Sequence, residues 1–291
     1  MEKSAKTLAL YKRLLDELKT EFGTPDLSFA KDTQKVISYI EGLDKAPATR
    51  KLYYAVLVAT LRDLKTGRTK LMRTAEDIYR LKMFSYNDAL QAIAERQEMS
   101  EREQAIWVNW EDVLSAHQKL KRCVETNKNP LDYLDYVLLS LYTLVPPIRA
   151  DWSPVIITTR MEGLEPKRNY LVVGEDKVSF VLQDYKTVAS GGIRCIELPK
   201  SLEDIIRWWL TMETSGYLFS DARNQPRSSE WLSKEVRNMM KRRTGKPAGI
   251  NILRHSYITH MRAGEAPVLQ QRDMANSMCH SVNQSQLYRR I

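Results

Sequence analysis

Hydrophobic residues recur at three- and four-residue spacing through the first part of the chain, and this periodicity most restricts the fold. The first stripe ends at Gly23 and consists of Leu8, Tyr11, Leu15, Leu18 and Phe22. A second helix is predicted around residues 36–40 and a third from Pro47, because Pro is favoured in the first helical turn. The spacing therefore predicts an all-helical N-terminal region.

The composition changes near residue 100. All six Trp and all three Cys lie beyond this point, and the segment before it is polar. Ser100 and Glu103 have the spacing of a capping box, which predicts a helix start. We predict a helical domain, a linker and a second domain over residues 1–95, 96–104 and 105–291.

The second half combines helical and β-rich patterns. The longest apolar run, residues 136–145, predicts a buried helix that ends at two prolines. Three short β-rich runs predict a small antiparallel sheet over residues 170–173, 178–182 and 193–198. Helical stripes then return. The expected fold class is mainly α (α+β), an all-helical N-terminal domain and a mostly helical C-terminal domain with a small antiparallel sheet.

The charge balance favours a polyanionic partner. Lys and Arg number 45 against 36 Asp and Glu, a net charge of +9, which is typical of proteins that bind nucleic acid or an anionic membrane. The ten-residue apolar run is too short to cross a bilayer, and the chain does not open with a signal peptide, so no membrane association is expected.

Two basic regions are candidates for DNA contact. One is the start of the third predicted helix, where Thr49 and Arg50 offer hydrogen-bond donors that can bind a phosphate. The other is residues 234–246, with six basic residues and one acid, of which we single out Lys241, Arg242 and Arg243. The alternative interpretation of the start of the third helix is a solvated first turn.

Common cofactor and metal motifs are missing. The sequence contains no GxGxxG, P-loop, HExxH or GxSxG pattern. Its three cysteines are scattered, without zinc-ligand spacing, which favours a reduced intracellular protein over a disulfide framework. We therefore expect neither a metal nor an organic cofactor.

Chemistry-bearing residues gather in four segments of the second half. Three of the four His lie in the final 37 residues. The segments, in chain order, are Thr-Leu-Val-Pro-Pro-Ile-Arg (143–149), Gln-Asp-Tyr-Lys-Thr (183–187), Ile-Leu-Arg-His-Ser-Tyr-Ile-Thr (252–259) and Met-Cys-His-Ser (278–281), with Tyr288 after the last. Asn251 is three residues from Arg254, which places both on one face of a predicted helix.

These segments resemble the active-site boxes of the tyrosine recombinases of the phage-integrase type. The resemblance covers roughly residues 100–291, and the N-terminal part is similar to the DNA-clamping core-binding domain of that family in length and helicity. It implies six catalytic residues in the family's order: Arg149, Lys186, Asn251, Arg254, His280 and Tyr288. The Pro-Pro-Ile-Arg variant is similar to recombinases of eukaryotic viruses and mobile elements.

The chemistry implied by this resemblance is strand exchange without metal or water. Tyr288 would attack a DNA phosphate and form a 3′-phosphotyrosyl link. Arg149 and Arg254 would stabilise the charge on the phosphate oxygens, with single hydrogen bonds from His280 and Asn251. Lys186 would protonate the leaving 5′ oxygen, and nearby Lys177 is the alternative candidate for this general acid. The implied partner is double-stranded DNA, bound by a homotetramer on two sites, and the protein would be soluble, intracellular and DNA-associated, in nucleus or cytoplasm.

Several positions depart from the family pattern. Asn251 stands where a His is usual and cannot transfer a proton at neutral pH. Met278-Cys279 replaces a usual Leu-Gly, the spacing from His280 to Tyr288 is about one residue short, and Asp151 is the acid available to orient Arg149. If the chain ends three residues after Tyr288, protomers would have to associate through a surface other than a tail helix.

Three functions stay open. The leading hypothesis is a site-specific integrase or recombinase. A type IB topoisomerase-like enzyme would use a similar residue set to relax supercoils as a monomer. A catalytically inactive DNA-binding relative would explain Asn251 and the shortened spacing. Taken singly, Tyr288, Arg149 and Lys186 fit surface positions, Asn251 a helix cap and His280 a structural histidine.

Overall fold

The computed structural model describes residues 5–64, 67–127, 129–262, 268–279, 285 and 287–290. The chain divides into two compact units, Met1–Arg96 and Gln97–Ile291. Each unit is described by itself. The described residues are mainly helical with one small sheet, which confirms the expected fold class.

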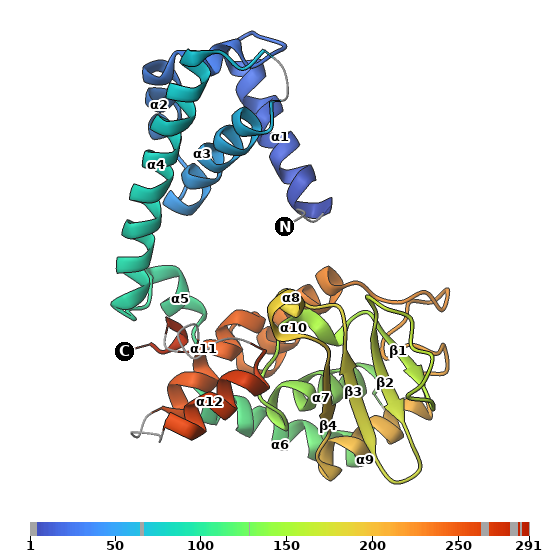
Figure 1. Ribbon diagram of the computed structural model, residues 1–291. Helices are drawn as coiled ribbons and strands as arrows, with labels where there is room; N and C mark the ends of the chain where they lie inside the picture. The colour runs from blue at the N-terminus through green and yellow to red at the C-terminus, as the bar shows by residue number, and fades with distance from the viewer. Residues whose placement is uncertain are drawn as a thin grey trace. The chain divides into compact units, whose positions relative to one another are not determined.

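The described part of the first unit is helical throughout (Figure 1). Its elements are α1 (Ala5–Glu21), the 3-10 turn η1 (Ser28–Lys31), α2 (Thr33–Gly42), α3 (Pro47–Arg62) and α4 (Lys70–Glu95). Helix α3 begins at Pro47 as predicted and is the most buried of them, with Tyr53, Tyr54 and Leu57 fully inaccessible to solvent.

Residues 62–82 carry seven Lys or Arg against three Asp or Glu, and some of these charges form structural ion pairs. This range includes the start of α4, where Glu76 is only 1% exposed. The guanidinium groups of Arg68 and Arg80 both bind the Glu76 carboxylate. A buried carboxylate needs such partners because desolvation of an unpaired charge is costly.

The second unit begins with short helix α5 (Glu101–Ile106). Ser100 and Glu103 form the predicted capping box at its start. This helix ends at Ile106, and Trp110 opens the next helix. The helices after α5 are α6 (Trp110–Thr126), α7 (Pro130–Thr143), α8 (Val188–Gly191), α9 (Lys200–Leu210), α10 (Ser229–Thr244), α11 (Ile250–Met261) and α12 (Val268–Ser277), with the 3-10 turn η2 (Ala150–Trp152).

The predicted antiparallel sheet is wrong in one respect: the sheet is mixed. Its strands are β1 (Val155–Thr158), β2 (Asn169–Val173), β3 (Val178–Leu182) and β4 (Arg194–Glu197), in that spatial order. The three strands expected from the β-rich runs pair antiparallel. The additional strand β1 pairs parallel to β2, with Val155 opposite Asn169, and brings the turn before it beside the sheet.

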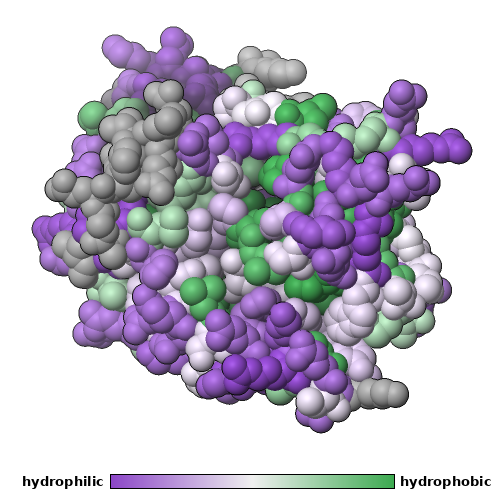
Figure 2. All heavy atoms as spheres, turned by 90° about the horizontal axis from the view of Figure 1, so that it is seen from below, coloured by the Kyte–Doolittle hydropathy of each residue, from purple (hydrophilic) through white to green (hydrophobic). Residues whose placement is uncertain are grey.

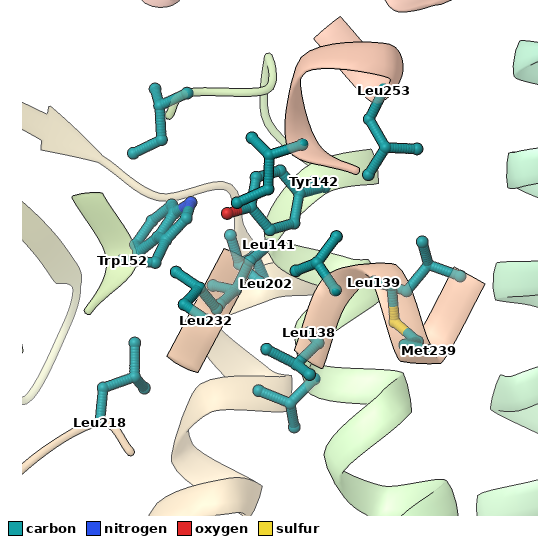
Figure 3. Close-up of a cluster of buried hydrophobic side chains, with 14 of the residues drawn as sticks. Leu138, Leu139, Leu141, Tyr142, Trp152, Leu202, Leu218, Leu232, Met239 and Leu253 are labelled. Carbon is teal, nitrogen blue, oxygen red and sulfur yellow. The ribbon is translucent and has the colours of Figure 1, made fainter. Parts of the chain in front are cut away.

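Helix α7 lies at the centre of the second core. Leu138, Leu139, Leu141 and Tyr142 are all fully buried, which agrees with the continuous apolar run that predicted this helix. Figure 3 shows these side chains meeting others from α9, α10 and α11, with Trp152 beside them. The helix therefore anchors the chain that follows it, which carries the site.

The surface gives no sign of a membrane-spanning element. No helix in the described ranges has both the length and the apolar character that a bilayer crossing requires. On the face seen in Figure 2, hydrophobic residues are surrounded by hydrophilic ones.

Candidate active site

A buried arginine is the central feature of the site. Arg254 lies on the inner face of α11 with none of its surface exposed. Its Nη1 donates to the carbonyl oxygen of Pro147 at 2.6 Å, whereas its Nε and Nη2 have no hydrogen-bond partner among the described residues. Burial lowers the pKa of this guanidinium from its ordinary value. A buried cation with unsatisfied donors is costly unless an anion binds it, so the site is suited to an oxyanion.

Arg149 lies in the same turn as Pro147, whose carbonyl oxygen accepts a hydrogen bond from Arg254. This turn follows α7, and the hydroxyl of buried Tyr142 donates to the Arg149 carbonyl oxygen at 3.3 Å. Figure 3 shows the Tyr142 hydroxyl directed away from α11, toward Trp152. Arg149 is close enough that its charge helps to lower the pKa of Arg254. Two neighbouring guanidiniums, only one of them buried, form a concentrated positive site.

Asp151 is an electrostatic neighbour of both arginines. Burial raises the pKa of its carboxyl group to about 6, and the charges of Arg149 and Arg254 oppose that rise. The expected relation between Asp151 and Arg149 is therefore present as an electrostatic interaction. Asp151 lies in η2, two residues beyond Arg149.

Tyr288 lies against Arg254. Its side chain is only 9% exposed, and the guanidinium carbon of Arg254 is 5.1 Å from the centroid of its ring. The two residues are far apart in the sequence, yet the fold brings the predicted nucleophile to the predicted phosphate-binding arginine. Ile258, Met274 and Met278 surround Tyr288 in a small apolar cluster.

His255 contacts Tyr288 and was not among the predicted site residues. Their rings stack with centroids 4.5 Å apart, and His255 Nδ1 lies 2.6 Å from the Tyr288 carbonyl oxygen. Because a carbonyl only accepts, Nδ1 must carry the proton. Burial lowers the pKa of His255 to about 4, so the ring is neutral near pH 7. The Arg-His pair in the sequence was a signal for this residue, but only the fold shows what its ring touches.

Lys186 lies in the connection between β3 and β4. Its side chain is exposed. The adjacent Thr187 donates through Oγ1 to the carbonyl oxygen of Cys279 at 3.1 Å, so this connection reaches the residue before His280. His280 itself lies outside the described residues. Lys177, the alternative candidate for the general acid, lies in the β2–β3 turn and forms an ion pair with Glu197.

Asn169 joins two of the site's turns and was missed by the sequence analysis. Its Nδ2 donates to the carbonyl oxygens of Asp151 at 3.3 Å and Asp184 at 2.9 Å. Its Oδ1 accepts from the backbone N–H groups of Gln183 and Asp184. A single buried side chain thereby ties the turn of Arg149 to the turn of Lys186.

Asn251 lies at the rim of a basic pocket. It is exposed in the first turn of α11, whose N-cap is Gly249, so the cap interpretation of Asn251 is wrong. The pocket has a volume of about 710 Å³ and is lined by Arg102, Arg149, Ser233, Arg237, Asn251 and His255, among others. Arg102 and Arg237 were not predicted as site residues. Three arginines on its wall suit an anionic ligand.

Two of the other predicted DNA contacts, Arg242 and Arg243, have structural partners. Arg242 and Arg243 bind the carboxylates of Asp132 and Asp135 on α7, of which Asp135 is fully buried. These ion pairs fasten α10 to α7. Lys241 is exposed.

Thr49 and Arg50 lie in the first turn of α3, in the first unit. Arg50 donates through Nε and Nη2 to the Leu43 carbonyl oxygen, at 3.1 and 2.7 Å, and so closes the connection between α2 and α3. Thr49 is half-buried.

Among the described residues, no group of three or more His, Cys, Asp or Glu side chains is arranged to hold a metal ion. The donor set of the site consists instead of guanidinium, ammonium, amide and phenol groups. These groups bind and react with anions.

No protein-family model matches the sequence, and no curated protein matches it. Among solved structures, the chain is similar to XerA recombinase, at 15% identity and a TM-score of 0.41, over 98% of this chain and 87% of that one. It is also similar to XerH site-specific recombinase bound to a palindromic difH substrate in a post-cleavage complex, at 14% identity and a TM-score of 0.44, over 82% of this chain and 66% of that one. A pre-cleavage complex of XerH has 15% identity and a TM-score of 0.41.

Proposed function

We propose that the protein is a site-specific DNA recombinase that breaks and rejoins strands through a 3′-phosphotyrosyl intermediate on Tyr288. The observation that carries the proposal is the position of Tyr288 against buried Arg254, whose Nε and Nη2 have no partner among the described residues. A phosphate oxygen would satisfy these donors, and the phosphorus would then lie near the phenol.

The other residues of the proposed site have separate roles in the cleavage step. Arg149 adds a second guanidinium for the developing charge on the phosphate. Lys186, exposed at the tip of its connection, donates the proton that the 5′ oxygen needs as the P–O bond breaks. Asn251 and His280 supply hydrogen bonds to the phosphate. A free 5′ hydroxyl of a second strand then attacks the phosphotyrosine and gives its proton to the deprotonated Lys186, and the P–O bond to Tyr288 breaks, which completes strand exchange.

The partner is double-stranded DNA. The net charge of +9 and the arginine-lined pocket support this choice, since phosphate contacts supply most of the affinity of DNA-binding proteins. Thr49, Arg50 and Lys241 are candidates for further backbone contacts. The active assembly is a homotetramer on two DNA sites, and the protein acts as an integrase of a virus or mobile element, inside the cell and associated with DNA.

The test is covalent capture on a nicked duplex. A nick just downstream of the scissile phosphate lets a short fragment leave, so the protein stays attached. Because the site sequence is unknown, the substrates are a library made from the ends of the element that encodes the protein. Wild type should give a protease-sensitive, slower band on a denaturing gel, and Tyr288→Phe should give none while still binding DNA.

Two other outcomes would point to the alternatives. Relaxation of supercoiled plasmid by a monomer, without any site requirement, would favour a type IB topoisomerase-like enzyme. Tight, salt-sensitive DNA binding without covalent capture by wild type would favour an inactive DNA-binding relative.

A further inference from the structure

The segment after Tyr288 is held by residues far from it in the sequence. Arg290 Nη2 forms an ion pair with Glu103 Oε1 at 3.0 Å, and the Arg290 backbone N–H donates to Thr259 Oγ1 at 2.9 Å. The two paired side chains are 12% and 26% exposed. A partly buried ion pair is screened less by solvent than an isolated surface pair, so it contributes more to holding the segment.

Glu103 uses its two oxygens for two different partners. Oε2 accepts from the backbone N–H of Ser100 at 3.0 Å, which closes the capping box of α5, while Oε1 faces Arg290. The carboxylate therefore connects the first helix of the second unit to the last described residues of the chain. Its pKa is lowered because the hydrogen bonds from Ser100 and the contact with Arg290 outweigh the effect of burial.

His255 completes this contact. Its Nδ1 donates to the Tyr288 carbonyl oxygen, and its Nε2 lies 3.4 Å from Arg290 Nη2. Because Nδ1 carries the proton, Nε2 is free to accept from the arginine. Tyr288 is thus held at its own carbonyl and at the residue two positions later. Both holding groups belong to the unit that carries Arg149 and Arg254.

We propose that Glu103 and Arg290 form a latch that positions Tyr288 against the arginines of its own chain, so that each protomer cleaves DNA in cis. This inference rests on the proposed function. Glu103 and Arg290 are positioning residues, because they act on the phenol through the backbone. Loss of the latch lets the nucleophile move away from the phosphorus, and a shift of about 1 Å lowers a rate by about 100-fold.

The structure offers a matched pair of variants for the latch. Glu103→Gln keeps an acceptor for the Ser100 N–H, since Gln also closes a capping box, but it loses the ion pair with Arg290. Ser100→Ala loses the side-chain half of the capping box and keeps the ion pair. In single-turnover cleavage of the nicked duplex at saturating protein, Glu103→Gln should be slower by about 10- to 100-fold. Ser100→Ala should cleave like wild type, and equal rates for the two variants would overturn the latch.

A second substrate separates positioning from a general structural defect. Sulfur in place of the bridging 5′ oxygen leaves as a thiolate and needs no proton when the P–S bond breaks. This substrate should restore the rate of Lys186→Ala, which lacks the proposed acid. It should not restore Glu103→Gln. Recovery of Glu103→Gln with sulfur would place its defect at the leaving group and overturn the proposal.

Cleavage in cis is tested with a mixture of two defective proteins. Tyr288→Phe has the arginines but no nucleophile, and Arg149→Ala has the nucleophile but an incomplete phosphate site. A size tag on one protein identifies the polypeptide that becomes linked to DNA, and co-purification through the tag verifies mixed assembly. Cis cleavage predicts no covalent product. A product on the Arg149→Ala chain would show cleavage in trans and overturn the proposal, whereas no product from wild type would instead refute the proposed function.

Discussion

The guanidinium of Arg254 donates a hydrogen bond to the carbonyl oxygen of Pro147 at 2.6 Å, across 107 positions of sequence. This bond joins helix α11 to the turn that carries Arg149. The two arginines that we propose bind the phosphate are therefore linked by one contact before any ligand arrives. Such preorganisation is the main source of electrostatic catalysis, since donors do not have to reorganise as charge develops.

Arg254→Lys should lower the rate of covalent capture by about 100- to 1,000-fold, because an ammonium can replace the charge but not the forked donors. The measurement is single-turnover cleavage of the nicked duplex, with DNA binding measured in parallel. A rate equal to that of wild type would mean that Arg254 has only a structural role. Arg207→Lys is a suitable control, since Arg207 binds backbone carbonyls of the β2–β3 turn rather than the site.

Asn169→Ala should destabilise the second unit by about 1–3 kcal/mol, because the backbone N–H groups of Gln183 and Asp184 would lose their acceptor. The free energy of unfolding in urea measures this change. Cleavage should also slow, since the turns of Arg149 and Lys186 would no longer be tied together. Asn127→Ala, at an exposed helix end, should change neither quantity; an equal loss there would contradict the role of Asn169.

Arg243→Ala should lower the stability of the fold, whereas Lys241→Ala should not. Arg243 binds buried Asp135 and is 21% exposed, so its loss should cost about 1–3 kcal/mol of stability rather than the larger penalty of a fully buried pair. Lys241 is exposed, and its loss should leave stability unchanged.

DNA binding completes this comparison. If Lys241 contacts a phosphate, its removal should reduce the slope of log affinity against log salt by about one. Arg243→Ala should leave that slope unchanged. A smaller slope without loss of stability in Arg243→Ala would restore Arg243 as a DNA contact.

His255 should make stability depend on pH. Its pKa is lowered from 6.5 to about 4 in the folded protein, so between these values the unfolded chain binds more protons. The stabilising contribution is complete above pH 6.5 and is lost as the pH falls toward 4. Asp151, whose pKa is raised to about 6, acts in the opposite direction below that pH.

The difference between wild type and His255→Phe isolates the histidine, because Asp151 is common to both. Phenylalanine keeps a ring to stack on Tyr288 but does not titrate. Urea unfolding at several pH values should show a weaker loss of stability on acidification in His255→Phe. Parallel curves for the two proteins would contradict a neutral, buried His255.

The sequence predicted local structure well where short-range patterns decide it. The apolar run of α7, the Pro47 start of α3 and the Ser100–Glu103 capping box all depend on neighbouring residues, and each is present. The parallel strand β1 was not predicted, because its pairing with β2 depends on how a connecting segment returns. The same limit applies to Arg242 and Arg243, whose partners Asp135 and Asp132 on α7 lie more than a hundred positions away.

The sequence by itself determined the chemical groups of the proposed site and their order along the chain: Arg149, Lys186, Arg254 and Tyr288. Only the tertiary structure decided that Arg254 is buried with unsatisfied donors, that Tyr288 lies against it, and that Asn169, His255 and Glu103 hold the site together. The physical reason is that a residue type sets what a group can donate or accept. Burial and contact are set by residues that packing brings together from distant parts of the chain.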